Sequence, residues 1–470
     1  MLFTQNSFLL LFLPLCWAAY AYLVQHRASR VLIWLIALAS VVFYAYDSLR
    51  NAGIMLTSIA INYTIARLMR AEAGETPRRK QLLFAGIALN LLLLCSFKYT
   101  GFLLENLAWV SGSTWSIPKI ALPLGISFYT FTQIAYLVDS YKRHDVDQDS
   151  GVFLLFVTFF PHLVAGPIIH HREMMPQFRR LGTHDINWRL VTTGLFLFAI
   201  GLFKKVLIAD TFAPWVDAGY ADTSRLGTVD AWLLSLGYSF QLYFDFSGYA
   251  DMAVGIGMLF GIFLPFNFNA PYKAQSIQDF WRRWHITLSR WLRNYLYIPL
   301  GGNRGGDTKT MRNLVVTFLL GGLWHGAGWP FIIWGALHGA ACAVHFAWSK
   351  RGYALTPVLG MVATFLFVNV AWVFFRAPSV TAALDVLSAM IGLAPSAVST
   401  NHFQPFLAEA MTMILIGSVI VWGLPNSQEI AFHRGGIPRA ARAIFTGVVI
   451  ATVILLNNAG TPSPFLYFNF

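Results

Sequence analysis

Long, nearly uncharged apolar runs constrain the fold of this chain more than any other feature. A membrane-spanning helix needs about 20 predominantly apolar residues. Charged residues make up only 11% of the chain, against roughly a quarter in a soluble protein, so too few remain to cover a water-facing surface. Because a single-chain span must satisfy its own backbone, these runs predict an all-α integral membrane protein. The runs fall at roughly 7–24, 31–48, 52–69, 82–104, 120–141, 190–209, 230–262, 313–347, 357–376, 411–424 and 441–458.

The positions of Lys and Arg between the runs predict how the chain is threaded. Arg27 and Arg30 follow the first run, and no positive charge precedes it. This pattern favours a retained first span with its N-terminus outside over a cleaved signal peptide. Segment 151–169 has basic residues on both sides, which predicts a re-entrant element. The acidic loop 210–230 is predicted to lie outside, and the strongly basic segment 263–312 is predicted to lie inside. The run at 313–347 must then enter and return, turning near 326–330. The whole pattern predicts about 9–11 crossings and a C-terminus outside.

The net charge of +12 is interpreted as cytoplasmic-side anchoring rather than as a nucleic-acid footprint. The basic residues cluster between apolar runs and form no stripe on a soluble module. The three cysteines, Cys16, Cys95 and Cys342, lie in apolar runs without paired or metal-like spacing, so they are predicted to be packing residues. No metal site is predicted, and the chain is expected to form one domain over 1–470.

The basic, Trp-rich segment 280–293 is the first candidate for chemistry. On a helix, His285 would share a buried face with the Trp residues while the Arg residues flank or oppose it. One interpretation is a lipid-anchoring interfacial helix with an incidental histidine. The other is that the arginines bind a polyanionic cofactor and His285 lines a catalytic tunnel, since a guanidinium fits phosphate. The candidate cofactor residues are Trp281, Arg282, Arg283, Arg290, Arg293, Arg304 and Trp324.

His325 is the second candidate, because it lies in a glycine-rich stretch between apolar flanks. A polar group at membrane depth is costly and usually lines a cavity or a pathway. Neutral imidazole suits a general base near pH 7. A hydrogen-bonded structural histidine is the alternative. His338 and His345 follow without the glycine-rich setting and are interpreted as structural. Asp245 and Asp251, in an apolar run, are interpreted as structural partners for buried arginines or histidines.

Four segments resemble the membrane-bound O-acyltransferase family, closest to its bacterial members that O-acetylate exopolysaccharides such as alginate or cellulose. They are Trp281–Ser289, Tyr295–Arg304, Leu323–Ala327 and the ending Ser463–Phe468. The resemblance covers nearly the whole chain, with its core at roughly 120–350. It implies a ring of helices with re-entrant and interfacial pieces around a central tunnel. It also implies that His325 is the catalytic histidine and that His285 is a second active-site residue.

The mechanism predicted from this resemblance transfers an acetyl group across the bacterial inner membrane. Acetyl-CoA is expected as a cytoplasmic acyl donor, with no permanently bound cofactor. His325 would take the proton of an acceptor hydroxyl, and His285 would position the thioester or polarise its carbonyl. The relatives imply a periplasmic partner resembling SGNH hydrolases, which would modify a polysaccharide acceptor. Peptidoglycan O-acetylation and teichoic-acid-type acylation remain alternatives, as do a transporter and a non-catalytic scaffold of a secretion complex.

Overall fold

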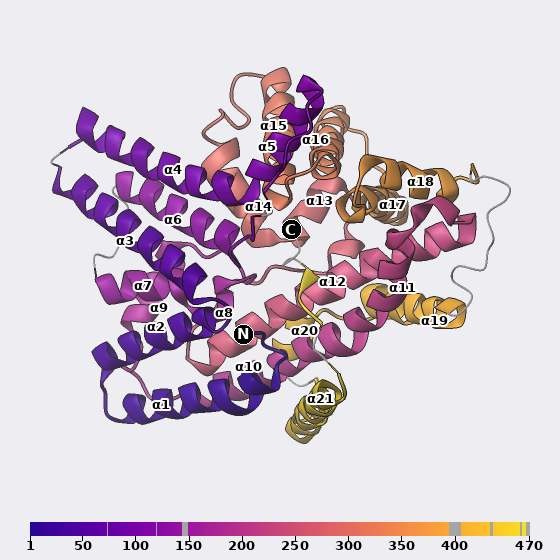
Figure 1. The fold of residues 1–470 in the computed structure, drawn as a ribbon. Coiled ribbons are helices and arrows are strands. Elements are labelled where there is room, and N and C mark those ends of the chain that lie inside the picture. The colour runs from indigo at the N-terminus through magenta and orange to yellow at the C-terminus, as the bar shows by residue number, and fades with distance from the viewer. Residues whose placement is uncertain are drawn as a thin grey trace. The chain divides into compact units, whose positions relative to one another are not determined.

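The computed structural model describes residues 1–72, 74–118, 120–142, 149–393, 406–432, 436–460 and 463–466. The last two residues of the C-terminal motif, 467 and 468, therefore lie outside the described residues. Over the described ranges the regular elements are all helices (Figure 1). Seven of them are long and apolar enough to cross a membrane, and three shorter apolar helices accompany these. The predicted all-α membrane fold is confirmed, while the predicted 9–11 crossings stay a prediction.

The chain divides into two compact units. The first comprises 1–199, 250–265 and 439–464, and the second comprises 200–249, 266–438 and 465–470. The helices of the first unit are α1 (Leu13–Gln25, preceded by a π-turn at Phe8–Phe12), α2 (Ser29–Ala45), α3 (Leu49–Ala71), α4 (Pro77–Lys98), α5 (Thr100–Ser111), α6 (Ile126–Tyr141), α7 (Ser150–Thr158), α8 (Phe160–Leu163), α9 (His171–Arg179) and α21 (Arg439–Ala459). Two helices contribute residues to both units, α10 (Trp188–Leu202) and α12 (Thr228–Leu259).

Buried amides and hydroxyls join α3, α4 and α6 in the first unit. The Asn90 amide donates to Asn62 Oδ1 over 2.6 Å, and the Gln133 amide donates to the Ser58 hydroxyl over 3.1 Å. Side-chain hydrogen bonds of this kind hold apolar helices together where lipid offers no hydrophobic driving force.

Segment 151–169 is divided into α7 and α8 by an extended residue, Phe159, before Pro161. Pro161 lies in the first turn of α8, and it could not continue α7 because it has no N–H to donate to the carbonyl four residues earlier. At nine residues, α7 is about 14 Å long, less than half of the roughly 30 Å hydrocarbon core. No helix of this segment is long enough to cross, in agreement with the predicted re-entrant element.

The second unit contains α11 (Asp210–Ala221), α13 (Ile277–Arg283), α14 (Ile286–Leu292), α15 (Asp307–His325), α16 (Trp329–Lys350), α17 (Pro357–Arg376), α18 (Val380–Met390), α19 (Leu407–Ser418) and α20 (Ser427–Phe432). The predicted hairpin is present, because α15 ends at His325 and α16 begins at Trp329 and packs back against it (Figure 1). Glycines allow this packing. A Cβ added to Gly335 would lie 2.4 Å from the Phe318 carbonyl oxygen, and one on Gly322 would lie 2.3 Å from that of Phe331.

Two local expectations were wrong. The acidic segment 210–230 was expected to be a loop, but the helix continues through a π-helical segment at Phe203–Ala209 to Ala221. Its position outside the membrane stays a prediction. Lys205 pairs with Asp210 over 2.6 Å, so the carboxylate is neutralised within the helix. Residues 280–293 were expected to form one helix, but His285 has a φ of 43° and separates α13 from α14.

Candidate functional site

The two motif histidines, 40 residues apart in the sequence, lie together in the second unit. His325 ends α15, His285 lies at the junction of α13 and α14, and their ring centroids are 6.5 Å apart. Both side chains are buried, with residue exposures of 0% for His285 and 4% for His325. The predicted buried face survives the break at His285, since Trp281, Trp284, Leu288, Trp291 and Leu292 are also buried.

The chain turns at His285, between two short helices. Ser276 begins α13, and its hydroxyl accepts from the backbone N–H of Asp279, the pattern of an N-cap. After Arg283 the backbone becomes extended at Trp284 and left-handed at His285, and α14 starts at Ile286. Left-handed residues other than Gly are uncommon. The surrounding residues therefore hold His285 in a backbone conformation that a histidine in an unfolded chain rarely adopts.

Asn267 orients the His285 ring. The backbone N–H of Thr287 donates to Asn267 Oδ1 over 3.2 Å, which identifies that atom as the carbonyl oxygen. His285 Nδ1 lies 3.4 Å from the same oxygen, so Nδ1 carries the hydrogen and Nε2 carries the lone pair. Burial lowers the pKa of His285 to about 3, so this tautomer is the neutral form present at pH 7.

Aromatic rings enclose the histidine pair. The His325 ring centroid lies 4.9 Å from Trp324, 5.0 Å from Trp334 and 5.2 Å from Phe375. Phe246 meets the His285 ring edge-on at 4.8 Å. These contacts fix the ring positions in a setting with little water, where hydrogen bonds to reacting groups are stronger than in bulk solvent.

An arginine-lined cavity of about 980 Å³ lies beside this cluster, within the same unit. Its volume is at the upper end of the roughly 300–1,000 Å³ usual for ligand sites. Four arginines line it, and none of its described lining residues is acidic. The lining includes Trp281, Arg282, Arg290, Arg293, Tyr297, Arg304, Cys342 and His345. This composition suits a large anionic ligand with an apolar part.

The predicted cofactor residues do not all lie in this cavity. Trp281, Arg282, Arg290, Arg293 and Arg304 line it. Arg283 instead pairs with Asp279 over 2.9 Å. Trp324 contacts the rings of His285 and His325.

The cavity lining includes neither motif histidine. The cavity and His325 are connected through two indole rings. The ring of Trp281, which lines the cavity, lies 5.8 Å from that of Trp334, and the Trp334 ring lies 5.0 Å from that of His325. The continuous tunnel implied by the resemblance stays a prediction.

Known proteins with similar sequences decide the family. The sequence model of the membrane-bound O-acyltransferase family matches residues 110–382. A peptidoglycan O-acetyltransferase of Helicobacter pylori is 42% identical over all of this chain and 98% of its own length. The chain belongs to the membrane-bound O-acyltransferase family. It is therefore an acyltransferase enzyme and a multi-pass membrane protein.

Other members of the O-acyltransferase family share this similarity. A probable alginate O-acetylase of Azotobacter vinelandii is 39% identical over the full length of both chains. A teichoic acid D-alanyltransferase of Bacillus subtilis is 30% identical over 54% of this chain and 68% of its own. The full-length relatives are named for acetyl transfer to two different polymers, so their names agree on O-acetylation and differ in acceptor.

His338 of the O-acyltransferase, which the sequence analysis interpreted as structural, lies in the same cluster of rings as His325. It is fully buried on α16, and Trp281 Nε1 donates to its Nδ1 over 3.2 Å. Its ring lies 4.7 Å from Trp334. His338 thus connects a lining residue of the cavity to a neighbour of His325. Because Cys342 and His345 are four and seven residues after His338, the sequence places all three on one face of a helix. That shared face was the signal by which His338 could have been connected with the cavity.

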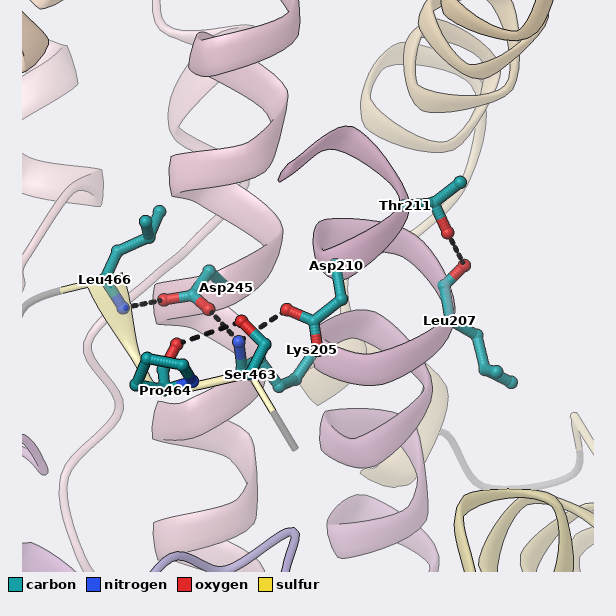
Figure 2. Close-up of polar contacts among 8 residues, drawn as sticks. All are labelled: Lys205, Leu207, Asp210, Thr211, Asp245, Ser463, Pro464 and Leu466. Atoms are coloured by element: carbon teal, nitrogen blue, oxygen red, sulfur yellow. Dashed lines mark hydrogen bonds and ion pairs between the residues drawn. The ribbon is translucent and has the colours of Figure 1, made fainter. Parts of the chain in front are cut away.

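Asp245 is paired with a buried cation, but its partner is Lys205 rather than the arginine or histidine that the sequence analysis expected. Figure 2 shows Lys205 between Asp210 and Asp245, at 2.6 and 2.7 Å, while Asp245 also accepts from the backbone N–H of Leu466 over 3.1 Å. Phe465, next to Leu466, packs on Phe246 at 5.6 Å. The network therefore holds the C-terminal motif against the ring that contacts His285.

No cluster of three or more His, Cys, Asp or Glu side chains suitable for a metal ion occurs in the described part of the O-acyltransferase. The groups that lie together here are the imidazoles of His285, His325 and His338, indole N–H donors and guanidinium groups. They can remove a proton, donate hydrogen bonds and bind an anion.

Proposed function

We propose that this enzyme takes an acetyl group from cytoplasmic acetyl-CoA and passes it across the bacterial inner membrane for O-acetylation of an extracytoplasmic polysaccharide. The observation that carries this proposal is the pairing of His285 with His325 beside an arginine-lined cavity. The names of its relatives, a peptidoglycan O-acetyltransferase and alginate O-acetylases, support acetyl as the acyl group.

The cavity would hold the coenzyme A part of the donor. Coenzyme A carries a phosphate and a diphosphate, and guanidinium groups bind phosphate through paired, charge-assisted hydrogen bonds. Arg282, Arg290, Arg293 and Arg304 supply such groups, and Trp281 offers an apolar surface at the side nearest the histidines. The thioester would reach past Trp281 toward His325.

His325 would act as the general base. It would take the proton of an acceptor hydroxyl as the hydroxyl oxygen attacks the thioester carbonyl, a contribution typically worth about 10²–10⁴-fold. Of the two roles predicted for His285, positioning fits its tautomer better. Polarising a carbonyl needs an N–H donor, whereas Nε2 of this tautomer is an acceptor.

The acetyl group would be received on the periplasmic side of the membrane. Both termini are proposed to be periplasmic, from the distribution of Lys and Arg. A periplasmic partner resembling SGNH hydrolases would receive the acetyl group and deliver it to the polymer. Alginate-like exopolysaccharide and peptidoglycan are both candidate polymers, since relatives with each name match over the whole chain.

Labelled acetyl-CoA and purified protein, with partner and acceptor present, test the enzyme and its base. Wild type should release coenzyme A and transfer label, and His325→Ala should lower kcat by about 10²–10⁴-fold. Wild-type protein without thioester turnover would exclude the proposed reaction. Equal turnover by His325→Ala would exclude the base assignment.

Donor binding is tested separately with the arginines. Arg282→Ala combined with Arg293→Ala should weaken acetyl-CoA binding at least tenfold in titration calorimetry. Lys309→Ala is the matched control, because Lys309 is an exposed cation of the same basic segment that does not line the cavity. Equal affinity in the double variant would move the donor site elsewhere.

A further inference from the structure

Two buried N–H donors on one face of α16 have no acceptor among the described residues. They are Nε1 of Trp334 and Nε2 of His338. The two residues are four apart on the helix, their rings lie 4.7 Å apart, and their exposures are 1% and 0%. Buried polar groups are nearly always hydrogen-bonded, so a neighbouring pair of unsatisfied donors indicates a position for an oxygen atom.

The tautomer of His338 makes its Nε2 a donor. Trp281 Nε1 can only donate, and it donates to His338 Nδ1 over 3.2 Å. The neutral ring must therefore carry its hydrogen on Nε2. This is the opposite of His285, whose hydrogen is on Nδ1 because Nδ1 faces the Asn267 oxygen. The two buried histidines are thus held in complementary states, one presenting an acceptor and the other a donor.

The pair lies where an acyl group would have to be. On one side, Trp334 contacts His325 at 5.0 Å. On the other, His338 bonds to Trp281, which lines the arginine-rich cavity. A thioester extending from that cavity toward His325 would pass these two donors.

We infer that Trp334 Nε1–H and His338 Nε2–H donate to the carbonyl oxygen of the acyl group and stabilise the oxyanion that forms on it. This inference rests on the proposed function and deepens it. Trp281 is a positioning residue, since it acts on the oxygen only through the tautomer of His338.

The step balances as follows. The acceptor hydroxyl oxygen bonds to the carbonyl carbon while His325 takes the hydroxyl proton, and the carbonyl electron pair moves to oxygen between the two donors. When the C=O bond re-forms, the C–S bond breaks and the thiolate leaves with the proton held by His325. One acyl ester and one thiol result. Removing a single oxyanion donor typically costs about 10²–10³ in kcat.

Infrared spectroscopy of a bound carbonyl tests the assignment. The probe is the ketone analogue of acetyl-CoA with CH₂ in place of sulfur, labelled with ¹³C at the carbonyl carbon. Two N–H donors should lower its C=O stretching frequency on wild-type protein. Trp334→Phe, which removes the N–H and retains a large ring, should raise that frequency and lower kcat by about 10²–10³ with a smaller change in KM for acetyl-CoA.

Conservative variants separate hydrogen bonding from packing. His338→Gln can accept from Trp281 and still donate, so it should keep the lowered frequency, whereas His338→Phe should lose it. Trp348→Phe is the matched control, an indole of the same helix that does not line the cavity, and should match wild type. If the analogue binds to Trp334→Phe and its C=O frequency is the same as on wild type, the inference about the two donors is wrong, while the proposed function is unaffected. Failure of wild type to bind the analogue would instead count against the proposed donor site.

Discussion

The left-handed conformation at His285 makes this position selective for residue type as well as for chemistry. With a φ of 43° and a ψ of 53°, it lies in a region that Asn and Asp adopt readily and that β-branched residues avoid. Asn267 then orients the ring through a carbonyl oxygen that also accepts from the Thr287 hydroxyl over 2.6 Å. Backbone and ring are thus determined by the same short turn.

Two substitutions at His285 should therefore separate folding from chemistry. His285→Asn should keep the Tm of the detergent-purified protein within a few degrees of wild type while lowering kcat by about 10²-fold or more. His285→Val should lower the Tm as well, because a β-branched residue is strained at positive φ. Thermal unfolding and acetyl-CoA turnover are measured side by side. Full activity in the Asn variant would contradict an active-site role for the ring.

The buried, neutral state of His285 also predicts acid sensitivity. Burial lowers its pKa in the folded protein to about 3, below the ordinary value of 6.5, so the unfolded chain takes up a proton first as the pH falls. Stability from this group is complete above pH 6.5 and is lost as the pH falls toward 3. At pH 5 the loss is about 2 kcal/mol. Lowering the pH from 7 to 5 should reduce the Tm of wild type more than that of His285→Asn. Equal reductions in the two proteins would contradict the predicted contribution of His285 to acid sensitivity.

At the scale of helices, the α15–α16 hairpin holds His325 in place. Gly322 and Gly335 bring the two helices close enough that each glycine lies against the backbone of the other helix. His325 is the last residue of α15, so any separation of the helices moves its ring relative to Trp334. Close packing of glycines takes the place of a hydrophobic driving force between helices in lipid.

Gly335→Ala tests this packing. Its Cβ would lie 2.4 Å from the Phe318 carbonyl oxygen, so the helices must separate, at a cost of about 1–3 kcal/mol. Lower Tm and lower kcat are expected together. Gly447→Ala on α21 is the control, because nothing lies within 4 Å of its added Cβ and Ala favours a helix more than Gly does. A Gly335→Ala protein as stable as Gly447→Ala would show that the close approach is not needed.

At the scale of the whole chain, the last described residues return to a site built from its middle. Leu466 bonds to Asp245 across 221 positions of sequence, and Phe465 stacks on Tyr249 at 4.7 Å. The buried Lys205–Asp245 pair anchors this contact. A buried ion pair contributes little net stability while intact, but an uncompensated charge left by removing one partner is costly.

Asp245→Ala should destabilise the protein by about 1–3 kcal/mol, since the Leu466 N–H loses its acceptor while Lys205 keeps Asp210 as its partner. Removing 463–470 should lower kcat with a smaller loss of stability, because Phe246 loses the Phe465 ring that supports it beside His285. Thermal unfolding and turnover distinguish the two effects. A wild-type kcat in the truncated enzyme would show that the C-terminal motif does not support the site.

The membrane class, the all-helical fold and the hairpin that turns next to His325 could all be predicted from the sequence. These depend on local properties, namely apolar run length, charge placement and motif residues. The family resemblance also agreed with the match over 110–382. Helix breaks were less predictable, because a π-turn at 203–209 and a left-handed His285 depend on contacts with distant residues such as Asn267.

Which residues lie together around the two histidines became known only from the packed helices. It separated Arg283, which pairs with Asp279, from the arginines that line the cavity. It brought His338 between Trp281 and Trp334 and thereby determined its tautomer. Hydrogen-bond partners distant in sequence cannot be read from composition or periodicity, because they exist only once helices from different parts of the chain have packed.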